Sequence, residues 1–184
     1  MNSNLLNTTT SVLLIVDIQE KLLKAQFKQE RIVKNASILA AAAKILGIPV
    51  IVSEQYPQGL GPTIKEIKEN LPENAEFFEK TSFNCCLESG FNDLIEKFNR
   101  KQILVCGMES HICVHQTVHS LITAGYETYI IQDAITSRKE AEYKYGLTRM
   151  INYGAIPSCT EMAVFELIKC AKHSQFKAVQ SLVK

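Results

Sequence analysis

The stretch ILVCGMESHICVHQTVHSLITAG, residues 103–125, decides the fold of this chain. It opens with an apolar run at 103–106 whose length and composition are typical of a strand buried on both faces of a sheet. Gly107 is expected to end that strand, and a helix is predicted to begin near Ser110. The residues that the spacing assigns to the buried face of this helix are Ile112, Val118, Leu121 and Ile122.

Cys113 falls in the first turn of the predicted helix, beyond the carboxyl end of the strand. The N–H groups of a first turn lack intrahelical partners, and the helix dipole is positive there. A thiol in this position is expected to lose its proton more readily than a free cysteine, whose pKa is about 8.5. The same N–H groups can hold the oxyanion that forms when sulfur attacks a carbonyl. The stretch alone leaves two interpretations open, a nucleophile or a small cysteine that fills space in the core.

Composition limits the class of protein. The chain has 184 residues, of which 46% are hydrophobic and 21% charged, as is ordinary for one globular domain. The net charge of +1 gives no electrostatic reason to expect nucleic acid or a membrane as partner, and the apolar runs are too short to span a bilayer. Six cysteines without a secretory signal before them predict a reduced, cytoplasmic protein.

Strand and helix patterns alternate along the chain. Strands are predicted at 12–16, 49–52, 75–80, 103–106, 128–131 and 155–157. Further helices are predicted at 30–46, 63–70, 91–98, 139–152, 160–171 and in the tail 172–184, whereas the glycines and prolines of 53–62 predict a loop. This pattern favours a single α/β domain over residues 1–184, with a parallel sheet covered by helices on both faces.

Two charged residues end predicted strands. Asp17 follows the run 12–16, and a carboxylate there must be paired, desolvated or functional, unless it only caps the next turn. Lys80 ends the strand 75–80, where a lysine is usually just solvated. The carboxyl ends of parallel strands meet at one edge of the sheet, where the sites of such folds lie. Asp17, Lys80 and Cys113 together can activate a sulfur nucleophile, because the carboxylate accepts its proton and the ammonium favours the thiolate.

Other polar patterns carry weaker signals. His111, His115 and His119 share one predicted helix face, but the first and third are two turns apart, too far to bind one ion, so structural or interface roles are favoured. Cys85 and Cys86 are interpreted as structural, since neighbouring cysteines form strained disulfides. The turn DIQEK after the first strand has no glycine, so the dinucleotide and P-loop motifs are both missing.

Four segments together resemble the isochorismatase-like cysteine hydrolases. They are VLLIVDIQ (12–19), FFEKTSFNC (77–85), ILVCGMESHICVHQT (103–117) and QDAITSR (132–138), in the family's order. The run GMESHICV and the loop SEQYPQGLGPT (53–63) resemble a subgroup whose members mostly have no assigned substrate. The resemblance implies a Rossmann-like, three-layer α/β/α fold with six parallel strands in the order 3-2-1-4-5-6.

The resemblance also implies the roles of individual residues. It implies a catalytic triad of Asp17, Lys80 and Cys113, and a cis peptide bond that we expect between Met108 and Glu109. The N–H groups of Glu109 and Cys113 would then form the oxyanion hole. The residues that we expect in the wall of the substrate pocket, with core or loop packing as the alternative, are Tyr56, Phe83 and Ile112.

One departure from the family concerns metal. Nicotinamidases of this family carry an Asp-x-His pair and a further His after the second strand, and these bind a metal ion. This chain has SEQY at 53–56 and no histidine at 53–79. We therefore expect no catalytic metal, no cofactor and no nicotinamidase activity.

The expected reaction is hydrolysis of a small amide or other C–N substrate through a thioester on Cys113. Alternatives are vinyl-ether cleavage as in isochorismatases proper, a catalytically idle scaffold, and a redox-responsive thiol protein with Cys106 or Cys85 as partner of Cys113. The expected partners are a small-molecule substrate and further copies of this chain. Neither nucleic acid nor a membrane is expected as a partner. The apolar stripe that favours self-association in the tail consists of Phe176, Val179 and Leu182.

Overall fold

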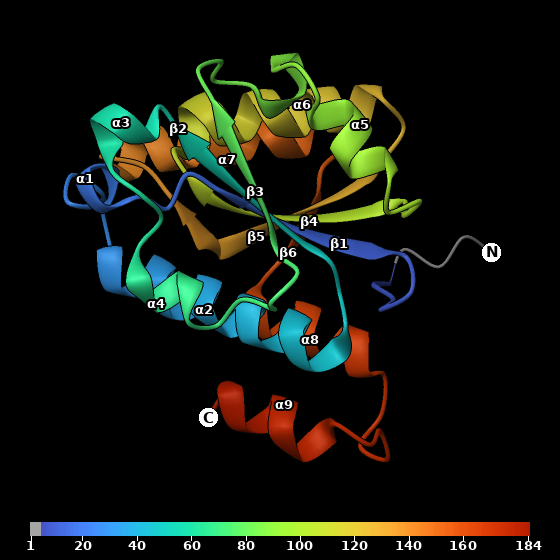
Figure 1. Ribbon diagram of the computed structural model, residues 1–184. Helices are drawn as coiled ribbons and strands as arrows, with labels where there is room; N and C mark the ends of the chain where they lie inside the picture. The colour runs from blue at the N-terminus through green and yellow to red at the C-terminus, as the bar shows by residue number, and fades with distance from the viewer. Residues whose placement is uncertain (1–4) are drawn as a thin grey trace.

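The computed structural model describes residues 5–184 and has the three layers expected from the sequence (Figure 1). The six strands are parallel and lie in the order β3-β2-β1-β4-β5-β6, which confirms the order that the family resemblance implied. Their bounds are β1 (Ser11–Val16), β2 (Val50–Gln55), β3 (Glu76–Lys80), β4 (Gln102–Met108), β5 (Glu127–Thr136) and β6 (Ile156–Ser158). The order reverses between β1 and β4, so the switch point lies beyond the carboxyl ends of these two strands.

Helices cover both faces of the sheet (Figure 1). One face packs against α2 (Gln29–Leu46), α4 (Lys65–Lys68) and α8 (Thr160–Ile168). The other packs against α5 (Phe91–Glu96), α6 (His115–Thr123) and α7 (Glu140–Asn152). Shorter turns complete the chain, namely α1 (Glu20–Leu23), α3 (Pro57–Leu60), the 3-10 turn η1 (Cys85–Leu87) and the π-helical turn η2 (Ser110–Val114).

The burial of β1 on both faces explains why residues 12–16 are all apolar and do not alternate with polar residues. Leu13 and Ile15 point into the core beneath α2, whereas Leu14 and Val16 point into the core beneath α6. All six residues of the strand are buried, because helices cover the sheet on both sides. After the apolar residues 12–16, the next polar side chain is that of Asp17, just past the carboxyl end of β1.

Two glycines allow the chain to pack closely around the turn that carries Cys113. Gly107 has a φ of +125°, and a Cβ atom at this position would lie 2.1 Å from the carbonyl oxygen of Val16. Gly146 on α7 lies against the carbonyl group of Ser110, from which a Cβ atom would be 2.6 Å away. A side chain at either position would therefore displace the strand ends or η2.

The structure corrects several predicted boundaries. Strand β4 continues through Gly107 to Met108, and β5 continues to Thr136 past an irregularity in its pairing with β4. Residues 53–55 belong to β2 and not to a loop, because their polar side chains find buried hydrogen-bond partners at the edge of the sheet.

The tail forms α9 (Phe176–Leu182), which packs on the body of its own chain (Figure 1). Val179 is fully buried in a small cluster with Ala42 of α2 and with Val164 and Ile168 of α8. Phe176 and Leu182 pack against the same cluster. The apolar stripe of the tail is thus used within the subunit, and it gives no support to the predicted self-association.

Within the described range 5–184, no helix has the length and apolar character needed to cross a membrane.

Candidate active site

Asp17, Lys80 and Cys113 come together at the carboxyl edge of the sheet. The Nζ atom of Lys80 donates a hydrogen bond to Oδ2 of Asp17 at 2.8 Å, and both side chains are completely shielded from solvent. The charge of the same carboxylate also acts on the thiol of Cys113, whose pKa it helps to raise. Cys113 itself is buried, 5% exposed, and belongs to the core cluster beneath α6. The carboxylate thus contacts the ammonium and influences the thiol electrostatically.

The Asp17 carboxylate is held from its other side by β2. Ser53 Oγ donates a hydrogen bond to Asp17 Oδ1 at 2.7 Å, and the Asp17 N–H donates to the Ser53 carbonyl at 3.1 Å. The backbone of Asp17 is left-handed, with a φ of +53°, a conformation that aspartate tolerates better than most residues. A buried carboxylate is stable only when it is paired and hydrogen-bonded, and each oxygen of Asp17 has such a partner.

The ammonium of Lys80 is fixed by more than the ion pair. It also donates to Gln55 Oε1 at 2.6 Å and to the carbonyl oxygens of Ser82 and Phe83 at 3.2 and 3.4 Å. Burial is the largest single influence on Lys80 and lowers its pKa, but the negative charge of Asp17, the hydrogen bond to it, and the nearby Cys85 and Cys113 together outweigh burial, and the net pKa is raised. The side chain therefore stays a cation at neutral pH.

The thiol of Cys113 differs from the expectation drawn from the sequence. Burial, and next the negative charge of Asp17, raise the pKa of Cys113, while Lys80 acts in the opposite direction. The resting group is therefore a neutral thiol under the influence of a neighbouring carboxylate. The prediction of a readily ionised cysteine at a helix start was wrong, because it considered the helix dipole and not the neighbouring carboxylate. Ionisation of this sulfur requires transfer of its proton to Asp17.

The turn that carries Cys113 is unusual in its backbone. The Met108–Glu109 peptide bond is cis, as the family resemblance implied. The following turn, η2, is π-helical, and the Glu109 carbonyl accepts the N–H groups of Ile112 and Val114 at 3.0 and 3.2 Å. Such single π turns occur frequently at functional sites. Glu109 is buried, and its side chain accepts a hydrogen bond from Arg138 Nε at 2.8 Å, which anchors the start of the turn to the segment after β5.

The three residues predicted to line the pocket differ in their surroundings. Tyr56 and Phe83 are each 55% exposed, and both adjoin Lys80, since the Tyr56 N–H donates to the Lys80 carbonyl and the Phe83 carbonyl accepts from Nζ. Ile112 is partly buried and packs against the core beneath α6. Tyr56 and Phe83 are thus available to a ligand at the rim of the site, whereas Ile112 contributes at least in part to the core.

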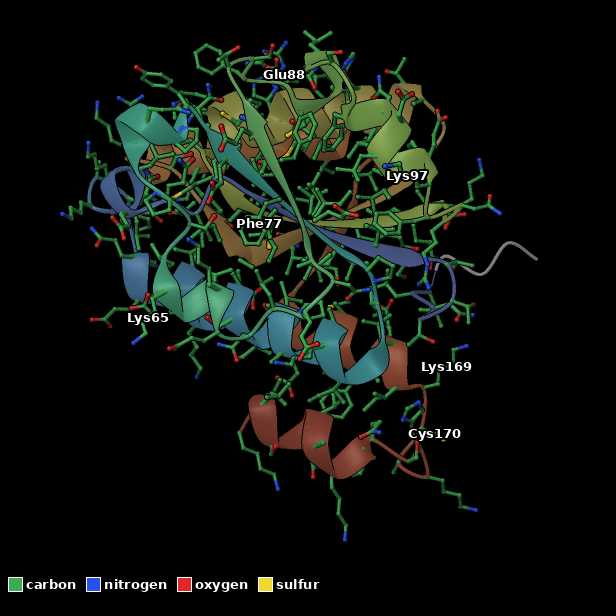
Figure 2. All side chains as sticks on the ribbon, viewed as in Figure 1. Lys65, Phe77, Glu88, Lys97, Lys169 and Cys170 are labelled. Carbon is green, nitrogen blue, oxygen red and sulfur yellow. The ribbon has the colours of Figure 1, made fainter. Side chains whose placement is uncertain are left out.

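The loop after β3 is held by a carboxylate outside the site. Glu88 accepts the N–H groups of Thr81 and Ser82, each at 2.8 Å, and these two bonds lower the pKa of Glu88. Figure 2 shows Glu88 beside the loop at the end of β3. This anchor orients the carbonyl groups of Ser82 and Phe83 that receive the Lys80 ammonium.

Sequence reasoning missed the glutamine network behind Lys80. The Gln55 side chain accepts from Lys80 and donates to the Thr81 carbonyl at 2.7 Å. Gln19 in turn accepts the Gln55 N–H at 2.8 Å and donates to the Gln55 carbonyl at 3.0 Å. A signal was present in the sequence: Ser53 and Gln55 are two residues apart directly after an apolar run, which places both on one face of a strand.

Two further buried thiols bear on the redox alternative. Cys85 is completely buried and interacts electrostatically with Asp17, Lys80 and Cys113. Cys106 packs in the core beneath α2, on the face of the sheet opposite to the core that contains Cys113. Cys106 is therefore excluded as a partner of Cys113, and all six cysteines are free thiols.

Among residues 5–184, no three or more His, Cys, Asp or Glu side chains are grouped as a metal would require.

Comparisons with known proteins match nearly the whole chain. The isochorismatase domain model matches residues 11–162. Isochorismatase domain-containing protein 2 of Danio rerio is 37% identical over 97% of this chain and 89% of its own length. The structure of the MAR1 ribonuclease from Caenorhabditis elegans is 35% identical, with a TM-score of 0.92 over 97% of this chain and 91% of that one. The YcaC protein of Escherichia coli, an octameric hydrolase of unknown specificity, shares the fold with a TM-score of 0.91 at 22% identity, over 97% and 88% of the two chains.

Proposed function

The chain belongs to the isochorismatase family, and we propose that it hydrolyses a small amide or related C–N substrate through a covalent bond to Cys113. The observation that carries this proposal is the buried Asp17 carboxylate, which accepts a hydrogen bond from the Lys80 ammonium at 2.8 Å and whose charge raises the pKa of the Cys113 thiol. A neutral nucleophile beside a base, with a cation to hold the charge, is the arrangement that nucleophilic catalysis requires.

The first half of the proposed reaction forms a thioester. Asp17 takes the thiol proton as the Cys113 sulfur attacks the substrate carbonyl, and the N–H groups of Glu109 and Cys113 hold the resulting oxyanion. Lys80 keeps the local charge balanced while Asp17 is protonated. When the C–N bond breaks, Asp17 returns the proton to the leaving amine, and the acyl group remains on sulfur.

The second half releases the product. A water molecule that takes the place of the amine gives a proton to Asp17 and attacks the thioester carbonyl. The same two N–H groups hold the second oxyanion, and the Cys113 sulfur leaves and recovers its proton from Asp17. The products are a carboxylic acid and an amine, and the site returns to its resting form.

Burial of the triad favours a small substrate. Asp17, Lys80 and Cys113 are 0%, 2% and 5% exposed, so the reacting group must enter a narrow opening. The relative from Caenorhabditis elegans is named as a ribonuclease, but the net charge of +1 on this chain does not favour a polyanionic substrate. The free thiols support the prediction of a reducing, cytoplasmic compartment.

We expect the protein to self-associate through the rim of the site. Tyr56 and Phe83 are 55% exposed there, and Leu87 on η1 is 74% exposed. Clustered exposed apolar side chains are typical of interaction surfaces. Light scattering on the purified protein measures this directly, and a monomer at micromolar concentration contradicts it.

The proposal is tested by a substrate survey. Small amides, ureido acids, carbamoyl compounds and a vinyl ether are offered to the wild type and to Cys113→Ala, with circular dichroism as the control for folding. Amide turnover that Cys113→Ala loses supports the proposal. Vinyl-ether turnover that survives in Cys113→Ala supports the isochorismatase-type alternative, and the absence of any turnover supports the idle scaffold.

A further inference from the structure

Three histidines remain outside the proposed reaction. They lie on η2 and α6, the elements that pack against α7. His111 has partners in Ser137 Oγ at 2.9 Å and Glu142 at 3.8 Å, which accounts for it structurally. His115 and His119 instead face a hollow between the two helices.

This hollow, the α6–α7 pocket, has a volume of about 320 Å³. Its lining residues come from the segment before η1, from α6 and from the end of α7, and they are Asn84, His115, Gln116, His119, Arg149 and Tyr153. None of them is an acid, and none belongs to the proposed triad. The pocket is therefore a second concave site with basic and neutral polar walls.

Arg149 supplies the permanent positive charge of the pocket. Its Nε donates to the Tyr153 hydroxyl, and its guanidinium lies over the Tyr153 ring at 5.5 Å. The His119 ring packs edge to face with Tyr153, with 4.7 Å between the ring centroids. Among the described residues 5–184, no carboxylate lies within ion-pair distance of Arg149. The outer guanidinium nitrogens are thus free to bind an anion.

His115 lies deepest among the basic groups. Its Nδ1 atom is buried and has no hydrogen-bond partner within the part of the chain that the structure describes. Burial, followed by the positive charges of Arg149, His111 and His119, lowers the pKa of His115. Buried polar atoms normally have partners, and basic groups placed together repel one another unless an anion lies between them.

We propose that the α6–α7 pocket binds a small oxyanion of the phosphate or carboxylate class, held by Arg149, His115 and His119. The planar guanidinium matches two oxygens of such a group, and the histidines add further donors. The volume suits a small ligand rather than a macromolecule. Because α6 continues directly from the turn that carries Cys113, the ligand would sit against the helix that supports the nucleophile.

The test is a titration with inorganic phosphate, and in parallel with malonate, followed by the NMR signals of the histidine rings. The chain has four histidines, and His173 lies in the segment before α9, far from the pocket in sequence, so it is an internal control. Saturable shifts of His115 and His119, with His173 unmoved, are expected. The response to phosphate or to malonate distinguishes the two ligand chemistries.

Two variants make the test specific. Arg149→Gln should weaken binding by about ten-fold or more, the equivalent of one charge-assisted hydrogen bond, and His119→Gln by less. Lys144→Gln removes the same charge from an exposed position on the same helix and should bind like the wild type. Equal affinity of the wild type and Arg149→Gln overturns the proposal, as does the absence of shifts with both anions. A change of oligomeric mass in Arg149→Gln without anion binding assigns the pocket to a subunit interface instead.

Discussion

Lys80 and Asp17 form an ion pair of 2.8 Å that is completely shielded from water, although 63 residues separate them in the sequence. Desolvation of two charges costs several kcal/mol per ion, and a buried pair often contributes little net stability compared with apolar side chains of the same size. We infer that the pair is present for the chemistry of Cys113 and not for the stability of the sheet.

The first prediction concerns this ion pair. Lys80→Met leaves the Asp17 carboxylate buried without its counter-ion, and Asp17→Asn leaves the Lys80 ammonium buried without its counter-ion. Each variant should lower the free energy of unfolding by about 3–5 kcal/mol. The double variant Asp17→Asn/Lys80→Met should lose clearly less free energy of unfolding than the sum of the two single losses, because neither charge remains. Urea unfolding measures all three. Strictly additive losses would show that the two side chains do not act as a pair.

The second prediction concerns Ser53. Ser53→Ala removes the hydroxyl that donates to Asp17 Oδ1 at 2.7 Å, a hydrogen bond to a charged group worth about 1.5–3 kcal/mol. We expect kcat to fall by about ten-fold or more with KM little changed, since the carboxylate is less well oriented. Ser53→Thr keeps the hydroxyl and should recover part of the loss. Ser181→Ala on exposed α9 is the control. A Ser53→Ala enzyme with wild-type kcat refutes this role.

The third prediction concerns Gly107. Gly107→Ala places a methyl group 2.1 Å from the Val16 carbonyl oxygen at a φ of +125°, so β1 and β4 must separate. We expect a loss of more than about 3 kcal/mol in stability. Gly125→Ala also has a positive φ, but its methyl group meets no atom within 4 Å, and it should cost only about 1 kcal/mol. Similar melting temperatures for the two variants would contradict the steric argument.

The edge of the sheet shows what the sequence could and could not predict. The strand order was implied by the family resemblance, and the structure confirms it. Asp17 and Lys80 were visible as charged residues that end predicted strands, and Cys113 was visible as a thiol in the first turn of a predicted helix. Residues 53–55 were assigned to a loop, since polar residues after a buried strand predict its end unless their partners are known. Those partners, Asp17 and Lys80, come from other strands, and only the folded sheet brings them within reach.

The protonation state of Cys113 could not be predicted for a related reason. A local pattern indicates the helix start and its dipole, but the pKa of a buried group depends on every charge around it. Here burial and Asp17 outweigh Lys80. The sequence therefore singled out Cys113 as a candidate nucleophile but assigned its thiol the wrong resting state.

The fourth prediction concerns pH. Burial raises the pKa of Cys85 from 9.0 to about 11, with Asp17 acting in the same direction. The folded protein then keeps a proton that the unfolded chain loses, so this contribution to stability is complete below pH 9 and is lost as the pH rises to about 11. The free energy of unfolding should fall across that range. In Cys85→Ala the slope should be shallower, by up to about 1.4 kcal/mol per pH unit. Chemical denaturation at several pH values measures the slope, and parallel curves would contradict the assignment.

The most direct test of the proposed chemistry is to identify the covalent intermediate. An accepted amide is mixed with the wild type, the reaction is stopped in acid during turnover, and intact mass followed by peptide mapping locates any added mass. We predict an adduct equal to the acyl part of the substrate on Cys113, absent from Cys113→Ala, which should also lack turnover. Continued turnover by Cys113→Ala, or an adduct located on another residue, would contradict the account.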